Sequence, residues 1–223
     1  MKLVNKFYNI EIELIENQVT IITVENPEAY SKCVGDIWNQ VSGNEGDFIL
    51  SECDKIKNIS KEMDCIINPF SLDCNNKKIV TRLYQELKLQ ADNLMQEEVS
   101  MLNANIIEFL DKLLFSVPYN TTYELDIDMS NLLKLYNVGI ETKAERLIDV
   151  IVEYFKVMLK LCNINIFVFI DLKHYLSKEH LEQLYQELFY LKIYLIIIEP
   201  IQTERLQNEK YWIIDNDLCI IEL

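Results

Sequence analysis

Residues 163–200 constrain the fold more than any other part of the sequence, because they place two apolar runs on either side of one amphipathic segment. The runs Ile164–Ile170 and Ile193–Ile198 are rich in Ile, Val and Phe and contain no Gly or Pro, which is typical of strands buried on both faces. The segment between them repeats leucine at helical spacing, at Leu181, Leu184, Leu188 and Leu191. The pattern predicts two parallel central strands joined by a helix, and therefore an α/β domain.

Each of the two apolar runs is followed by a carboxylate, Asp171 after the first and Glu199 after the second. Ligands of open α/β sheets bind at the carboxyl ends of the strands, which is where both residues are expected. Asp171 resembles the magnesium-holding carboxylate of nucleotide hydrolases, although a strand-end Asp that caps the next turn is the commoner case. One alternative hypothesis is therefore a metal-dependent NTPase or nuclease that uses Asp171 and Glu199.

The sequence lacks the phosphate loop that such an enzyme needs. A strand is predicted at Val19–Val24, and a helix is predicted from Asn26-Pro27 onward, but the sequence between and after them contains no GxxxxGK[ST] element, and the chain has four glycines. His174 and His180 lie six residues apart, which does not match the i, i+4 spacing of helical metal pairs, and we interpret them as surface residues. This indicates the architecture of an NTPase without its chemistry.

Two hairpins are expected at the ends of the chain. Asn9–Leu14 alternates apolar and acidic residues, and we expect it to pair with Val19–Val24 across a short turn. Tyr211–Ile214 and Leu218–Ile221 flank the turn-forming sequence Asp-Asn-Asp, which predicts a hairpin at the edge of the sheet.

A long helical insertion is expected between the two parts of the sheet. Residues 77–116 contain no Gly or Pro and repeat apolar residues at helical spacing, with a turn or kink expected near Asn103 and Asn105. The predicted domains are a head formed by residues 1–76 and 163–223 and a helical leg formed by residues 77–162, including an apolar helix at 147–159.

The charge and cysteine content limit the classes of function. The chain has 36 acidic and 21 basic residues and a net charge of −15, which argues against a generally basic nucleic-acid surface. This charge is compatible with another alternative hypothesis, an acidic scaffold that binds only protein partners. Six cysteines without a CxxC pair, no signal peptide and no apolar run of about 20 residues predict reduced thiols in a cytoplasmic protein that is not in a membrane.

A short acidic segment is the clearest candidate for a metal site. Glu124, Asp126 and Asp128 alternate with apolar residues, so that in an extended chain their carboxylates lie on one side. Grouped carboxylate oxygens suit Ca²⁺, but the glycine and terminal Glu of an EF-hand loop are missing. From spacing alone a solvated edge strand is favoured over a metal site, and Ser130 is expected to cap the short helix that follows.

Several stretches together resemble a known family, the short CRISPR-associated adaptation proteins of type II-A systems (the Csn2 family). The stretches that carry the resemblance are CIINPFSLDCNNKKIVTRLYQEL at 65–87, ELDIDMSNLLKLYNVGIET at 124–142, and INIFVFIDLKHYLSKEHLEQLYQEL with LIIIEP within 164–200. Their order and the chain length also match, so the resemblance extends over nearly the whole chain. None of the stretches is a short catalytic signature.

The resemblance implies an α/β head that is similar to a P-loop ATPase but lacks the phosphate loop, with a long helical leg inserted in it. It also implies a homotetrameric ring without enzymatic activity that binds the ends of double-stranded DNA in a lysine-lined channel and is held in shape by Ca²⁺. Members act in the acquisition of new spacers, in antiviral defence, alongside the adaptation integrase and the RNA-guided nuclease of the same locus.

The resemblance also indicates which residues to test. It implies acidic calcium ligands near the junction of leg and head, for which the candidates here are Glu124, Asp126 and Asp128, with Glu141 as a further one. For DNA phosphates the candidates are the basic residues that bracket this acidic segment, Lys134, Lys143 and Arg146.

Overall fold

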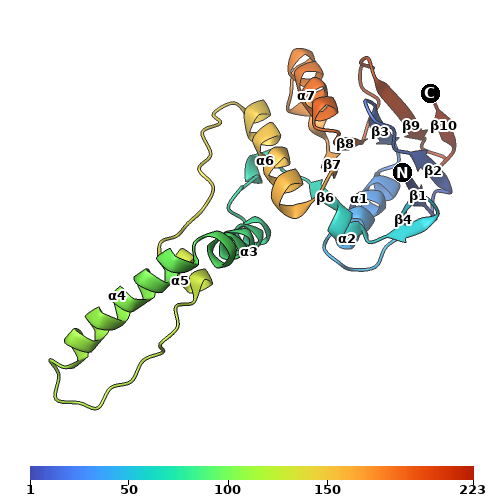
Figure 1. The fold of residues 1–223 in the computed structure, drawn as a ribbon. Coiled ribbons are helices and arrows are strands. Elements are labelled where there is room, and N and C mark those ends of the chain that lie inside the picture. Colours follow the sequence, from blue (N-terminus) through green and yellow to red (C-terminus); the bar gives the residue numbers. More distant parts are fainter. The chain divides into compact units, whose positions relative to one another are not determined.

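Six strands form the central sheet of the larger of two units in the computed structural model, which describes all 223 residues (Figure 1). In spatial order they are β10 (Ile220–Glu222), β9 (Glu209–Ile214), β3 (Val19–Val24), β8 (Tyr194–Glu199), β7 (Ile166–Ile170) and β6 (Met63–Ile66). All neighbouring pairs are parallel except β9 and β10. The predicted parallel unit and the predicted C-terminal hairpin at the sheet edge are both confirmed.

Helices cover both faces of this sheet. These are α1 (Pro27–Val41) on one face, and α6 (Leu147–Cys162) with α7 (Lys178–Tyr190) on the other. Successive residues of β7 point to opposite faces, so that Val168 joins the core around α1 while the ring of Phe167 stacks on Phe155 of α6, with centroids 4.0 Å apart. Every residue of β7 is buried, as its continuous apolar sequence predicts.

A smaller antiparallel sheet shares one hydrophobic core with α1. It is formed, in spatial order, by β2 (Ile10–Glu13), β1 (Lys2–Asn5), β4 (Phe48–Glu52) and β5 (Lys55–Lys57), and α2 (Ile59–Glu62) follows it. The predicted hairpin of Asn9–Leu14 with Val19–Val24 is therefore wrong, because β2 pairs with β1 and β3 belongs to the large sheet. The burial pattern gives the reason: alternate residues of β2 are exposed, whereas every residue of β3 is buried and needs cover on both faces.

Residues 74–141 form a separate, helical unit. It contains α3 (Lys77–Leu94), α4 (Gln96–Leu114) and α5 (Met129–Leu135). The break between α3 and α4 lies at Met95, so the turn expected near Asn103 and Asn105 is wrong. Asn103 is accommodated within α4 because its side-chain amide donates to the carbonyl of Leu125, 2.8 Å away.

The observed boundaries of the helical unit differ from the expected leg. We expected residues 77–162, but residues 142–223 group with residues 1–73. The reason is the packing of α6, whose Ile151 and Phe155 are fully buried and whose Tyr154 hydroxyl donates to Asp64 on β6 over 2.7 Å. α6 therefore belongs to the α/β unit, defined here as residues 1–73 and 142–223.

Two short turns complete the α/β unit, η1 (Pro69–Ser71) and η2 (Leu172–His174). None of the helices in either unit combines the length and the apolar character that crossing a membrane requires.

Phe155→Ala is expected to lower the free energy of unfolding by about 3–5 kcal/mol, because it removes a fully buried ring that stacks on Phe167. Urea unfolding of the full chain measures this loss. Phe115→Ala is the matched control, since that ring is 94% exposed, and we expect a change within about 0.5 kcal/mol. Equal losses in the two variants would contradict the assignment of α6 to the core.

Candidate functional site

Three side chains that could hold a metal ion converge at the carboxyl ends of β7 and β8. The ligand atoms of Asp171, His174 and Glu199 all lie within 4.8 Å of one another. His174 Nδ1 lies 2.6 Å from Asp171 Oδ1 and 3.6 Å from Glu199 Oε2. The sequence predicted that Asp171 and Glu199 lie at this end of the strands. It did not predict that His174 joins them.

The local backbone explains how these side chains meet. Ile170 and Ile198 are opposite each other in the parallel pair, so the next residues, Asp171 and Glu199, emerge side by side. Asp171 adopts the left-handed conformation (φ 60°), which Asp tolerates better than most residues, and its amide donates to the carbonyl of Ile198 over 2.9 Å. The turn η2 follows, in which residues three apart lie above one another, so the His174 ring lies over Asp171.

Glu199 lies in an environment that disfavours its charge. It is fully buried, and burial raises its pKa to about 7, with a further increase from the neighbouring Asp171 carboxyl group. The hydrogen bond from the Lys173 amide to Glu199 Oε1 (3.0 Å) opposes this shift. On α1, burial raises the pKa of Tyr30 to about 12, and the charges of Asp171 and Glu199 add to this increase.

A buried ion pair lies next to this cluster. The Lys173 ammonium is 2.8 Å from Glu209 on β9, and the exposed fractions of the two side chains are 5% and 0%. The Tyr185 hydroxyl and the Leu206 amide both donate to the Glu209 carboxylate, at 2.7 Å each. Burial and Glu209 together raise the pKa of Tyr185, which keeps this hydroxyl a donor. The network holds Lys173 in place, and Lys173 in turn donates its amide to Glu199.

The predicted calcium ligands occupy exposed positions in the helical unit. Glu124, Asp126 and Asp128 lie in the segment between α4 and α5, and Glu141 is at the end of the unit. Asp128, rather than Ser130 as expected, is the N-cap of α5, because its Oδ1 accepts from the Ser130 amide at 2.9 Å. Within one chain these four residues do not form a group of three or more closely spaced ligand atoms. Calcium binding by them stays a prediction.

The predicted phosphate-binding residues differ in their surroundings. Lys134 is an exposed residue in the last turn of α5, and Lys143 is exposed in the α/β unit. Arg146 precedes α6 and holds Asp149 with two hydrogen bonds, of 2.6 and 2.9 Å, which keeps the pKa of Asp149 below its ordinary value. Its guanidinium is therefore already neutralised by a carboxylate in this structure.

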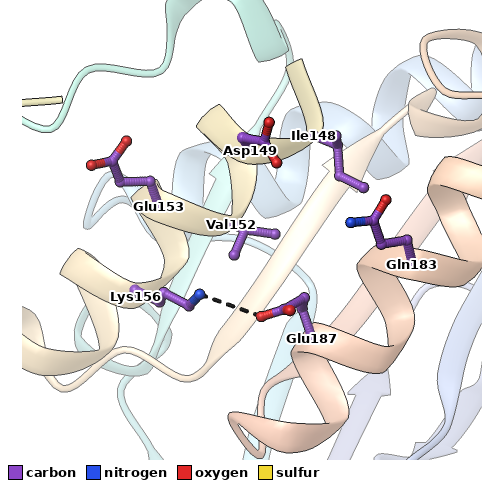
Figure 2. Close-up of a pocket in the computed structure, with 7 residues that line it drawn as sticks. All are labelled: Ile148, Asp149, Val152, Glu153, Lys156, Gln183 and Glu187. Atoms are coloured by element: carbon purple, nitrogen blue, oxygen red, sulfur yellow. Dashed lines mark hydrogen bonds and ion pairs between the residues drawn. The ribbon is translucent and has the colours of Figure 1, made fainter. Parts of the chain in front are cut away.

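Asp149 also lines a groove between α6 and α7 (Figure 2). Its floor is apolar, formed by Ile148 and Val152, and its rim carries Asp149, Glu153 and a pair between Lys156 and Glu187, 3.3 Å apart. Carboxylates outnumber cations around this groove, so phosphates would be repelled there unless the carboxylates were neutralised.

A two-residue connection joins β3 to α1. Asn26 in this connection accepts hydrogen bonds from the amides of Glu28 (3.0 Å) and Ala29 (3.1 Å), and Pro27 has no amide hydrogen. The amides at the start of α1, which bind phosphate in P-loop proteins, therefore have a partner within the chain.

Comparison with known families shows which family this chain belongs to. The model of the family described as CRISPR-associated protein (Cas_Csn2) matches residues 40–218. The chain belongs to the Csn2 family. A curated relative, the CRISPR-associated protein Csn2 of Streptococcus agalactiae, is 23% identical over 211 residues, which cover 93% of this chain and 92% of the relative.

A solved structure shares the fold of this Csn2-family protein. The crystal structure of Stu0660 of Streptococcus thermophilus superposes with a TM-score of 0.64 and 14% identity, and the match covers all of this chain and 76% of the other. An ATP-binding cassette of an ABC transporter in its ADP conformation gives a TM-score of 0.46 at 14% identity, and the match covers 95% of this chain and 82% of the other.

Sequence reasoning missed two features of the site in this Csn2-family protein. His174 was interpreted as a surface residue, and its side chain is indeed 49% exposed, but it contacts both carboxylates. Lys173 is not among the predicted site residues. The available signal was the sequence Asp-Leu-Lys-His directly after a buried strand, since residues in that position lie at the ligand-binding end of the sheet.

Lys173→Met is expected to lower the free energy of unfolding by about 3–5 kcal/mol, because it leaves Glu209 buried without its counter-charge. Thermal or urea unfolding measures this. Lys178→Met is the control: the pair of Lys178 with Glu204 (2.6 Å) is exposed, and we expect a much smaller loss of stability. A Lys173 variant as stable as the Lys178 variant would show that the buried network does not depend on this ammonium.

Proposed function

We propose that this Csn2-family protein is a non-catalytic, calcium-dependent ring protein that binds the ends of double-stranded DNA during CRISPR spacer acquisition. The observation that carries the proposal is the family match over residues 40–218. In this proposal the protein is a homotetramer that acts alongside the adaptation integrase and the RNA-guided nuclease of its locus.

The acidic segment of the helical unit supports a role for Ca²⁺. Glu124 and Asp126 are exposed, and Asp128 uses only Oδ1 to cap α5, which leaves its other oxygen available. Ca²⁺ takes six to eight oxygen ligands, more than these side chains supply in one chain, so further ligands from Glu141, water or a neighbouring subunit would complete the site. Calcium binding would then be coupled to assembly, because a shared ion binds the assembled form more tightly.

The connection between β3 and α1 supports a role without nucleotide hydrolysis. Asn26 occupies the amides that a phosphate loop would present, and a head without that loop cannot hold a triphosphate in the usual way. The alternative of an NTPase or nuclease at Asp171 and Glu199 would gain support from hydrolysis that Asp171→Ala abolishes. The alternative of an acidic, protein-only scaffold would gain support from a tetramer that never retains duplex DNA.

Neutralising the acidic segment with Glu124→Gln, Asp126→Asn and Asp128→Asn together is expected to abolish calcium-dependent tetramer formation. Asn caps a helix as well as Asp does, so the last change removes the charge and keeps the start of α5. Light scattering with and without Ca²⁺ measures the mass. We expect the unmodified protein to form a tetramer with Ca²⁺ and the triple variant to show no response.

A matched control separates position from net charge. Glu86→Gln, Asp92→Asn and Glu97→Gln also remove three negative charges, but from exposed residues of α3 and α4. This control variant is expected to keep the calcium response. Loss of the response in both variants, or in neither, would contradict calcium binding by the acidic segment.

Asp149→Asn is expected to tighten binding of linear duplex DNA and to steepen its dependence on salt, because it releases Arg146 for a phosphate contact. One additional phosphate contact changes the slope of log K against log salt by about 0.9. Equilibrium binding at several salt concentrations with Ca²⁺ measures the slope, and closed circular DNA of the same length tests the preference for ends.

Glu145→Gln is the control for this experiment, since it removes a charge next to Arg146 without touching the pair with Asp149. We expect it to leave the slope nearly unchanged, and we expect Arg146→Ala to cancel the gain in the Asp149→Asn background. If both single variants tighten binding equally, Arg146 does not contact DNA.

A further inference from the structure

We propose that Asp171, His174 and Glu199 form a binding site for a divalent transition-metal ion of the zinc class, in the α/β unit. This site is separate from the calcium site of the proposed function, since it uses different residues and a different unit of the chain. It also differs from a phosphate-loop metal site, because it requires no nucleotide.

The three ligand atoms lie near the spacing that a small ion requires, since all are within 4.8 Å of one another. Bonds from Zn²⁺ to nitrogen and oxygen of about 2.0–2.2 Å in a tetrahedron place neighbouring ligand atoms roughly 3.3–3.6 Å apart. His174 Nδ1 already lies 3.6 Å from Glu199 Oε2, and its 2.6 Å separation from Asp171 Oδ1 needs to open by less than about 1 Å. The His174 side chain is 49% exposed, so it has the freedom to make this adjustment.

A buried oxygen without a partner points to a ligand. Glu199 is fully buried, and while its Oε1 accepts from the Lys173 amide, its Oε2 makes no hydrogen bond. A buried acceptor left without a partner costs about 1–3 kcal/mol, so such atoms call for an explanation, and a bound ion is one. Here the free oxygen lies beside the imidazole nitrogen of His174, where a cation would bond to both atoms.

Hydrogen bonds hold Glu199 and the backbone of Asp171 in defined positions. This favours a metal site of fixed geometry over non-specific attraction of cations. The Glu199 carboxylate is oriented by the Lys173 amide, and the Lys173 side chain is held by Glu209 in the buried network. The backbone of Asp171 is held by the hydrogen bond from its amide to the carbonyl of Ile198. Hydrogen bonds that orient ligands in this way raise the affinity of a metal site.

The ligand chemistry selects the class of ion. An imidazole nitrogen with two carboxylate oxygens suits zinc and related first-row metals, whereas Ca²⁺ and Mg²⁺ prefer oxygen ligands alone and more of them. Three protein ligands also leave a position for water, and His174 lies on the exposed side of the cluster.

Zinc binding is tested by calorimetry on the metal-free, full-length protein carrying Cys53→Ser and Cys219→Ser. These two changes remove the exposed thiols, which would otherwise compete for the probe, Zn²⁺ alone. We expect one equivalent of Zn²⁺ to bind to this background variant, and we expect millimolar Ca²⁺ not to displace it.

His174→Ala is expected to weaken this binding more than tenfold, since even residues that only orient ligands cost 10–100-fold. His180→Ala is the matched control: it removes the other histidine of the chain, which lies on α7 outside the cluster, and we expect no change. Glu199→Gln is a second test that keeps an acceptor for the Lys173 amide. If it does not fold, the half-exposed His174 still decides the matter.

The outcomes separate this inference from the proposed function. Weaker zinc binding in His174→Ala together with unchanged zinc binding in His180→Ala supports a zinc site in the α/β unit. Absence of zinc binding in the background variant, or equal affinity with and without His174, overturns the inference. Failure of the calcium and DNA experiments would not affect it, because its readout is the affinity for Zn²⁺.

Discussion

The parallel pairing of β7 and β8, buried on both faces, is the constraint on which the rest of the structure depends. Because neither strand meets solvent, helices are required on both sides, and α1, α6 and α7 supply that cover. The same pairing brings Asp171 and Glu199 together, since residues that follow opposed positions of parallel strands leave the sheet side by side. The packing of the core and the chemistry of the site therefore have one origin.

Short patterns in the sequence were sufficient to predict several helices and strands. The apolar runs predicted β7 and β8, Asn26-Pro27 predicted the start of α1, and the C-terminal turn predicted the last hairpin. The pairing of β3 with β8 and β9 and the membership of α6 in the α/β unit depend on contacts between distant residues. No pattern within a short window determines such contacts.

The same distinction applies to the candidate site. The end of a strand is visible in the sequence, so Asp171 and Glu199 could be predicted, whereas the contact of His174 with both depends on the left-handed backbone at Asp171. The net charge follows directly from the sequence. The pairing of Arg146 with Asp149 and the burial of Lys173 with Glu209 could not be predicted from it. For an acidic chain this matters, because a cation that is already paired contributes little to attracting DNA.

Asn75 has a consequence for how this chain can change in evolution. Its side chain accepts from the amide of Ile140 (2.8 Å) and donates to the carbonyl of the same residue (3.0 Å), so one amide group joins the two ends of the helical unit. A segment whose ends are fastened together can gain or lose length with little effect on the fold that carries it, because the entropic penalty of closing a loop grows slowly with its size. We therefore expect changes of length within the helical unit to disturb the fold of the α/β unit little.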